Sequence, residues 1–429
     1  MFASTKNSHI NLLTMTRIDR IALLIIPALL AGVVLQAQIY EFRGEGRTGI
    51  FNETNLLSEW PSGGPPLIWE VSGFGTGYSS VTPTADAVYV TGRMGDYDIV
   101  TSYSHDGTKN WEINYGRAWD RTYPETRSIP TFYNGHLYLV SGQGDIVCVS
   151  ANGEKRWSVN HFEKYNAPAP RFGISESPLV ADGKVFVTPG GSQTSLVAFD
   201  AETGNLVWAT EALDEGAQYV NPTMIEHNGR RMVVTLLTNT IIGVDPSDGT
   251  IIWSVDYAGM QSGRARVNHA VTPLFRDGFI FVTSGYNHTA VKLQLSPDGS
   301  SADVVWTNDD IDTHHGGAVL LGDYLFASNY QSNTMGDWVC VDWNSGETKW
   351  ATRWNTKGSI IAADGLLYLY EERRGNLALV RPDPRGLDII SEFRLNTRSD
   401  GPFWAHPVIH NGRLYVRHGD YLAVFDISN

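Results

Sequence analysis

Cysteine and charge are both scarce in this sequence. Two of the 429 residues are cysteine, and 18% of the residues are charged. Beyond the N-terminal region there is no long stretch rich in Glu, Lys and Ala, which would be typical of extended helices. Aromatic residues and glycine are plentiful instead, with 13 Trp, 19 Tyr and 43 Gly. Because aromatic side chains favour strands and glycine favours turns, the composition predicts an all-β protein.

Basic residues are fewer than acidic ones. The chain has 32 Lys and Arg against 46 Asp and Glu, so its formal net charge is −14. An acidic surface repels nucleic acid and anionic lipid. We therefore expect a protein that does not bind nucleic acid. We also expect a monomer.

Long apolar runs are also missing, apart from residues 21–35, which follow two arginines. This run is shorter than the ~20 apolar residues that span a bilayer. A basic segment, an apolar segment and a small residue before a cleavage point are typical of a secretory signal peptide. We predict a signal peptide over residues 1–37, with Met15 as an alternative start of translation. A retained N-terminal anchor is the other interpretation.

The predicted cleavage point has no cysteine near it, so we do not expect a lipid anchor on the mature protein. We expect export to the periplasm or to the outside of the cell, and no membrane span in the mature protein.

An aromatic residue recurs through the chain at a spacing of roughly 42 to 53 residues, which is the length of one propeller blade. In most repeats it follows a β run and a polar turn that ends in glycine. Such a glycine between two strands is typical of a hairpin. The recurring aromatic residues are Trp69, Trp111, Trp157, Trp208, Trp253, Trp306, Trp350 and Phe393.

A second hairpin signal precedes each of these turns. Asn-Gly and Asp-Gly pairs, which strongly favour hairpins, stand before alternating apolar runs. Each repeat therefore predicts four antiparallel strands, and eight repeats predict an eight-bladed β-propeller. The last repeat lacks its fourth strand, whereas a strand of that type stands alone at 66–71. We expect it to pair beside 421–426 and close the ring, which removes the open sheet edges.

Residues 200–208, with the sequence DAETGNLVW, carry the pattern D-x-x-T-G-x-x-x-W. This pattern resembles the repeat signature of the PQQ-like β-propeller family, and degenerate copies span residues 66–429. The family includes quinoprotein alcohol dehydrogenases and the propeller lipoprotein of outer-membrane β-barrel assembly. Residues 42–50 are similar to the opening of secreted PQQ-like proteins of unassigned role. We therefore predict a lead-in over 38–65 and a propeller over 66–429.

The two cysteines, Cys148 and Cys340, occupy matching positions in the second and sixth repeats. These blades lie on opposite sides of a ring, far beyond the ~7 Å between Cα atoms that a disulfide spans. We predict two buried free thiols.

The connections between blades are long and variable, so one rim of the ring is elaborated, and such a rim is the expected functional face. Polar residues stand where these connections reach the innermost strands, at which groups distant in sequence converge on the axis. We predict a ligand-binding funnel there. Its expected residues are Arg127, Glu176, Asn221, Arg266, Asn268, His269, His314, His315, Lys357, Trp404 and His406.

Histidines in this set raise the question of a metal. We expect His314 and His315 to be neighbours on a strand, so that only one of them faces the axis with His269 and His406, because strand side chains alternate. A site of His269, His315 and His406 would then suit zinc, copper or iron. The other interpretation is that these histidines only form hydrogen bonds.

The family resemblance implies, for a dehydrogenase, a quinone cofactor (PQQ) at the same funnel and a calcium ion. Glu176, Asn221 and Asn268 carry oxygens of the kind that calcium binds. However, the adjacent-cysteine pair of the alcohol-oxidising members is absent, as are their long insertions. PQQ and calcium therefore belong to the alternative function, and no cofactor is expected for the main one.

We predict a non-catalytic binding or scaffolding propeller that engages a small molecule, a carbohydrate or a protein at the rim. One alternative is a quinone- or metal-dependent oxidoreductase, which retained cofactor would support. Another is a factor of outer-membrane protein assembly, which co-purification with a barrel-assembly partner would support.

Overall fold

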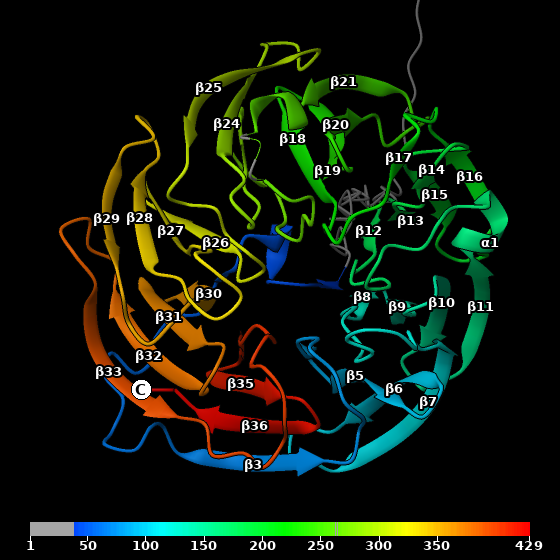
Figure 1. Cartoon of the computed structure of the whole chain (residues 1–429). Coiled ribbons are helices and arrows are strands. Elements are labelled where there is room, and N and C mark those ends of the chain that lie inside the picture. The colour runs from blue at the N-terminus through cyan, green and yellow to red at the C-terminus, as the bar shows by residue number, and fades with distance from the viewer. Residues whose placement is uncertain (1–37, 262, 264) are drawn as a thin grey trace, which may run out of the picture. The chain divides into compact units, whose positions relative to one another are not determined.

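Eight sheets, almost entirely antiparallel, stand around a ring in the computed structural model (Figure 1). The structure describes residues 38–429 except 262 and 264, so the predicted signal peptide and the alternative start at Met15 lie outside the described residues. The predicted all-β fold, an eight-bladed β-propeller closed by an N-terminal strand, is confirmed.

The first four blades run through the sequence in order. Blade 1 has β4 (Thr82–Pro83), β5 (Val88–Met94), β6 (Tyr97–Tyr103) and β7 (Lys109–Arg117). Blade 2 has β8 (Thr131–Tyr133), β9 (His136–Val140), β10 (Asp145–Ser150) and β11 (Lys155–Asn160), followed by α1 (His161–Tyr165). Blade 3 has β12 (Leu179–Ala181), β13 (Lys184–Val187), β15 (Val197–Asp200) and β16 (Leu206–Ala209). Blade 4 has β18 (Thr223–His227), β19 (Arg230–Leu236), β20 (Thr240–Val244) and β21 (Ile251–Asp256), followed by the 3-10 helix η2 (Ala258–Met260). A small two-stranded sheet of β14 (Gly190–Gly191) and β17 (Glu215–Gly216) stands beside them.

The last four blades follow the same plan. Blade 5 has β22 (Leu274–Arg276), β23 (Phe279–Val282), β24 (Ala290–Leu295) and β25 (Ala302–Asn308). Blade 6 has β26 (Ala318–Leu321), β27 (Tyr324–Ser328), β28 (Trp338–Asp342) and β29 (Thr348–Thr352). Blade 7 has β30 (Gly358–Ala363), β31 (Leu366–Glu371), β32 (Asn376–Arg381) and β33 (Asp388–Arg394). Blade 8 has β34 (Val408–His410), β35 (Arg413–His418) and β36 (Tyr421–Asp426), with β3 (Leu67–Ser72) as its outer strand.

Strand β3 closes the ring as predicted. It pairs antiparallel with β36, with Ser72 opposite Tyr421 and Leu67 opposite Phe425. This pairing, which we call the clasp, joins the beginning of the repeat region to the last strand, so every blade has its outer strand.

Residues 38–53 cross the centre of the ring. Strand β1 (Ile39–Tyr40) adds to blade 2, and β2 (Ile50–Phe51) adds to blade 7, so these two blades have five strands. Between them, the 3-10 helix η1 (Glu45–Arg47) lies near the middle of the ring, in blue in Figure 1. Arg47 is 1% exposed and donates to the carbonyls of Ser177 and Pro178 at 3.0 and 2.7 Å. The segment therefore fills part of the central channel.

The repeated tryptophans join neighbouring blades. Trp157 of β11 lies against Gly204 of blade 3, and its Nε1 donates to the carbonyl of Ala201 at 2.9 Å. Gly204 has a φ of +72°, and a Cβ there would lie 2.7 Å from the indole, so the repeat requires glycine at this turn. The same contact places Trp69, Trp111, Trp208 and Trp306 against Gly107, Gly153, Gly249 and Gly346.

The core lies between blades and not at one centre. Eight clusters of buried apolar side chains occur in the described part of the chain, one at each interface between neighbouring blades. Cys148 on β10 and Cys340 on β28 are buried free thiols in blades 2 and 6, as predicted. Burial raises their pKa values to about 11 and about 12.

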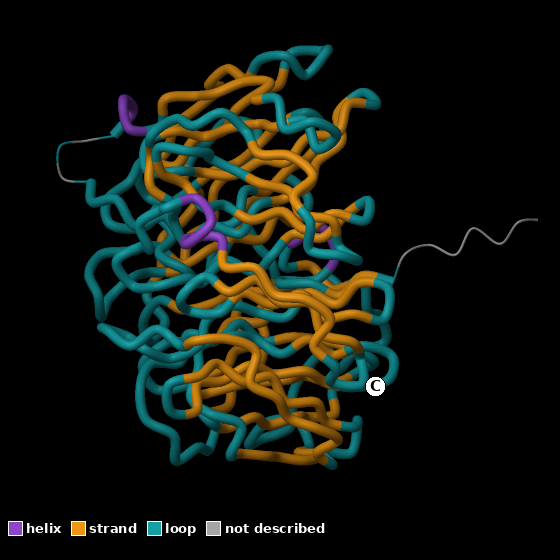
Figure 2. Tube along the Cα trace, turned by 90° about the vertical axis from the view of Figure 1, so that its right-hand side faces the viewer, coloured by secondary structure: helices purple, strands orange, loops and turns teal. Residues whose placement is uncertain are grey.

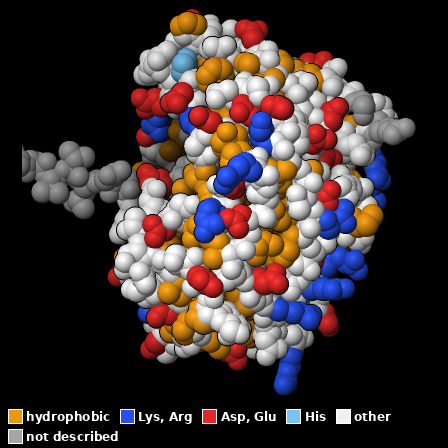
Figure 3. All heavy atoms as spheres, turned by 90° about the vertical axis from the view of Figure 1, so that its left-hand side faces the viewer, with side chains coloured by type: hydrophobic (Ala, Val, Ile, Leu, Met, Phe, Trp, Pro, Cys, Tyr) orange, Lys and Arg blue, Asp and Glu red, His pale blue; other side chains and the backbone are white. Residues whose placement is uncertain are grey.

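Loops gather at the two faces of the propeller, while the strands lie between them, and the larger loops are on one face (Figure 2). Apolar side chains are exposed among charged ones on the flank that Figure 3 shows. The exposed apolar residues of the described chain include Val304 and Val305 of β25, each 44% exposed. None of the helices in the described residues has the length and apolar character needed to cross a bilayer.

Candidate functional site

A cavity of about 800 Å³ opens where the connections between blades meet the axis of the ring, and we call it the funnel. Cavities that hold small molecules in proteins have roughly 300 to 1,000 Å³. The wall comes from seven of the interblade connections, from the turns 283–289 and 329–337, and from Phe42 of the lead-in. The predicted convergence of distant segments is therefore present.

Five aromatic side chains form a continuous arc on the funnel wall, which we call the aromatic arc. Their order is Tyr78, Trp404, Tyr123, Phe172 and Tyr219, with ring centroids 4.8, 5.5, 5.8 and 6.0 Å apart. Tyr123 is 45% exposed and has a φ of +55°. Aromatic faces of this kind stack on planar rings and on the apolar faces of sugars.

Three arginines provide the cationic charge of the described lining. Arg171 lies over the ring of Phe172 at 5.3 Å, and Arg266 lies over the ring of Tyr286 at 5.7 Å. Arg127 donates to the carbonyl of Phe172. No ion pair joins these three arginines to a carboxylate within the described residues. Their guanidinium groups are therefore available to an anionic ligand.

The base of the funnel is closed by the lead-in. Arg43 donates to the carbonyls of Ile360 and Ala318 at 2.9 and 2.6 Å and to Nδ1 of His406 at 2.9 Å. Phe42 packs edge-on against the same histidine at 5.1 Å. Burial lowers the pKa of Arg43 to about 9, so it stays charged at neutral pH. The lead-in therefore acts as a floor.

Most of the predicted funnel residues do line this cavity. They are Arg127, Asn221, Arg266, Asn268, His314, His315, Trp404 and His406. Three others, Glu176, His269 and Lys357, are each 1% exposed and lie behind the wall.

Glu176 and Asn221 are committed to backbone groups. Glu176 accepts hydrogen bonds from the backbone N of Thr188 at 3.1 and 3.2 Å, and Asn221 Oδ1 accepts from the backbone N of Ser177 at 2.6 Å. Burial raises the pKa of Glu176 to about 8, so the neutral acid predominates at pH 7. The calcium set of Glu176, Asn221 and Asn268 therefore does not fit, because Glu176 is buried behind the wall and the oxygens that Glu176 and Asn221 would offer already accept hydrogen bonds from backbone N–H groups.

The predicted three-histidine metal set is not assembled either. His269 uses both ring nitrogens, one with Ser284 Oγ at 2.9 Å and one with the carbonyl of Thr238 at 3.1 Å. Nδ1 of His406 accepts from Arg43, and its Nε2 donates to the carbonyl of His315 at 2.9 Å. Burial lowers the pKa of both imidazoles, so they are neutral hydrogen-bonding groups.

The expectation that only one of His314 and His315 faces the axis is wrong. Both line the funnel, with ring centroids 4.2 Å apart. They lie in an irregular segment before β26 and not on a strand, so strand alternation does not apply. Gly317 follows them with a φ of +74°, which turns the chain into β26.

Several funnel residues could not be found from the repeat pattern. Tyr286 and Asn333 come from turns within blades, and Phe42 comes from the lead-in, where Arg43 beside it is buried and contacts His406 of the lining. Glu372, at the turn after β31, reaches the histidine pair from blade 7. The sequence signal for Phe42 and Arg43 was the resemblance of residues 42–50 to the opening of secreted PQQ-like proteins, and no signal marked Tyr286, Asn333 or Glu372.

Comparisons with known proteins agree with this architecture. A family model described as outer membrane protein assembly factor BamB matches residues 96–352, more than half of the chain. No curated protein matches the chain significantly in sequence.

Solved structures share the fold at low sequence identity. BamB from Moraxella catarrhalis is 16% identical with a TM-score of 0.59, covering 84% of this chain and 97% of that one. A quinohemoprotein alcohol dehydrogenase from Pseudomonas putida is 12% identical with a TM-score of 0.60, covering 91% and 80%. A computationally designed protein is 10% identical with a TM-score of 0.58, covering 85% and 100%. On the match to more than half of its length, the chain belongs to the BamB-like family of PQQ-like repeat propellers.

Proposed function

We propose that this protein is an exported, non-catalytic binding propeller whose funnel holds an acidic carbohydrate. The observation that carries the proposal is the charge of the funnel. The whole chain has a net charge of −14, yet the charged side chains of the described funnel lining are arginines, beside histidines. An anionic ligand gains charge-assisted hydrogen bonds from such groups.

The aromatic arc supports a carbohydrate as the neutral part of the ligand. Aromatic rings that are already held in a cavity wall lose little conformational freedom when a ligand binds, and they offer large contact areas. Arg171 lies over Phe172 of the arc, and Arg266 lies over Tyr286, another aromatic residue of the funnel lining. A sugar ring on the arc would therefore present a carboxylate to a guanidinium.

A binding role also agrees with the positions of the buried carboxylates. Asp98, Glu176 and Asp312 have pKa values raised by burial, to about 6, 8 and 7. None of them lines the funnel, and each accepts hydrogen bonds from backbone amides. They support the scaffold, and no carboxylate of the described lining is in place to act as a general base on a ligand.

Calorimetric titration with oligogalacturonate tests the proposal. Arg171 and Arg266 are exposed, so Arg171→Ala and Arg266→Ala should fold normally. Charge-assisted hydrogen bonds contribute about 1.5 to 3 kcal/mol, so each variant should lose about tenfold or more in affinity. Arg385→Ala, whose side chain is 87% exposed in a distant turn, is the matched control.

Two outcomes would overturn this assignment. Absence of saturable binding, or equal affinity in all three variants, would remove the funnel as the carbohydrate site. Pyrroloquinoline quinone is the second probe, and uptake that depends on Arg171 and Arg266 would favour the oxidoreductase alternative. Co-purification with a barrel-assembly partner would instead favour a role in outer-membrane protein assembly.

A further inference from the structure

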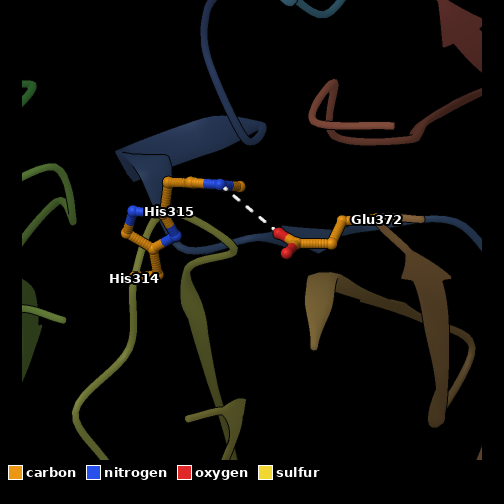
Figure 4. Close-up of side chains that lie close together, drawn as sticks. All are labelled: His314, His315 and Glu372. Carbon is orange, nitrogen blue, oxygen red and sulfur yellow. Dashed lines mark ion pairs between the residues drawn. The ribbon is translucent and has the colours of Figure 1, made fainter. Parts of the chain in front are cut away.

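The histidine pair of the funnel faces a buried carboxylate from another blade. His314 and His315 precede β26, and Glu372 follows β31; one ligand atom from each lies within 4.8 Å of the others (Figure 4). Nε2 of His315 is 3.5 Å from Oε2 of Glu372. Ligand atoms of a tetrahedral site with bonds of about 2.1 Å lie roughly 3.4 Å apart, so this pair already has a suitable separation.

Three potential ligand atoms in this cluster have no hydrogen-bond partner within the described residues. They are Nδ1 of His314, Nε2 of His315 and Oε2 of Glu372. The side chain of Glu372 is only 4% exposed. Buried polar atoms normally have partners, because an unpartnered one loses its hydration without compensation. Their convergence points to a missing common partner.

The other atoms of the same side chains are already held. Nε2 of His314 lies 2.9 Å from the hydroxyl of Tyr286, and Oε1 of Glu372 pairs with Nζ of Lys357. Lys357 is fixed in turn by the carbonyl of Asn333 at 2.9 Å. Metal-binding histidines and carboxylates usually have such outer partners, which fix their orientation. Tyr286 and Lys357 thus turn the free atoms toward one another.

Desolvation and the nearby charge of Lys357 both lower the pKa values of the His315 and His314 imidazoles. Burial raises the pKa of Glu372, which Lys357 and the nearby Trp404 oppose. Lys357 would repel a bound cation, but its charge is shared with the carboxylate that it contacts.

We propose that His314, His315 and Glu372 bind a divalent transition-metal ion, of which zinc is the best fit. Two imidazoles and one carboxylate suit zinc and leave a fourth position for water or a ligand. His314 and His315 line the funnel, so that position faces the cavity. This inference goes beyond the proposed function, because the ion would bind whether or not a carbohydrate does.

Zinc titration of the untagged protein, after treatment with a chelator, tests the site directly. We expect one zinc ion per chain by calorimetry, and a Co²⁺ absorption spectrum typical of a low-coordinate site. His315→Ala and His314→Ala should each weaken zinc binding at least tenfold. Tyr286→Phe should weaken it by about ten- to a hundredfold with the stoichiometry unchanged, since it removes only an outer partner.

His410→Ala is the matched control, because His410 stacks on His105 at 6.2 Å and forms a second histidine pair away from the funnel. Glu372→Gln would complete the series. However, it removes the negative charge that pairs with buried Lys357, so this variant is expected to be less stable. If Glu372→Gln unfolds at a lower temperature than the other variants, the zinc affinities of His314→Ala and His315→Ala alone decide the test. No saturable binding, or zinc affinity unchanged in both, would overturn the proposal and leave a structural Lys357–Glu372 ion pair. Because oligogalacturonate plays no part in the zinc titration, failure here would leave the carbohydrate proposal standing.

Discussion

At the scale of single residues, Glu176 shows how a polar position of the sequence can serve the scaffold. Its carboxyl group is buried behind the funnel wall and accepts hydrogen bonds from Thr188. Burial raises its pKa from 4.5 to about 8, while Arg47 and Thr188 partly oppose this rise. The folded protein therefore keeps a proton on Glu176 that the unfolded chain loses above pH 4.5.

This proton gives a pH dependence with a definite sign. Between pH 4.5 and about 8 the folded state binds more protons than the unfolded state, so this group lowers stability as the pH rises. The slope is at most about 1.4 kcal/mol per pH unit for one group. Glu176→Gln removes the effect, so its free energy of unfolding relative to the wild type should increase from pH 5 to pH 8.

Urea unfolding of the two proteins at several pH values measures this difference. Asp98 and Asp312 make the same contribution to the pH dependence of both proteins, so this contribution cancels in the difference between their free energies of unfolding. Glu202→Gln, at an exposed turn position, should show no such trend. A difference between Glu176→Gln and the wild type that is the same at pH 5 and pH 8 would mean that Glu176 is ionised in the folded protein.

At the scale of the element, the blade interface rests on the contact between a tryptophan and a glycine. Gly204 and Gly183 both lie in blade 3 with positive φ values, +72° and +69°. A Cβ on Gly204 would meet Trp157 at 2.7 Å, whereas a Cβ on Gly183 would meet nothing within 4 Å. An alanine at Gly183 therefore introduces backbone strain alone, whereas an alanine at Gly204 introduces backbone strain and a steric clash with Trp157.

Alanine at these positions should give unequal losses of stability. Gly183→Ala should cost only the strain of a left-handed alanine, about 1 to 2 kcal/mol. Gly204→Ala should cost about 1 to 3 kcal/mol more, because it also forces Trp157 out of its place. Chemical unfolding of the two variants measures this difference, and equal losses would show that the tryptophan does not depend on close contact with the turn.

The same contact explains why the sequence allowed the fold to be predicted in such detail. A tryptophan of one blade lies against a turn glycine of the next at five of the eight interfaces, and Asn-Gly or Asp-Gly turns occur in most repeats, because neighbouring blades pack in the same way. Glu372, Tyr286 and the lead-in have no counterpart in the repeat, so periodicity could not place them. We predicted a strand at His314 and His315, whereas β26 begins at Ala318, three residues after His315.

At the scale of the whole molecule, ring closure and the lead-in produce a funnel that is open on one side. The clasp of β3 and β36 fixes eight blades, and Arg43 and Arg47 hold the lead-in across the axis. The sequence predicted that loops converge at the axis, and eight of the eleven predicted residues line the cavity. It did not predict the floor, because the contacts of Arg43 join residues more than 270 positions apart.

The proposed function requires that the funnel selects an anionic sugar through its arginines. The most direct measurement compares oligogalacturonate with neutral oligogalactose of the same length, by calorimetry at low and high salt. We predict that the acidic ligand binds at least tenfold more tightly at low salt, and that high salt reduces this preference by screening. Equal affinity for the two ligands, or a preference that salt does not change, would contradict the account.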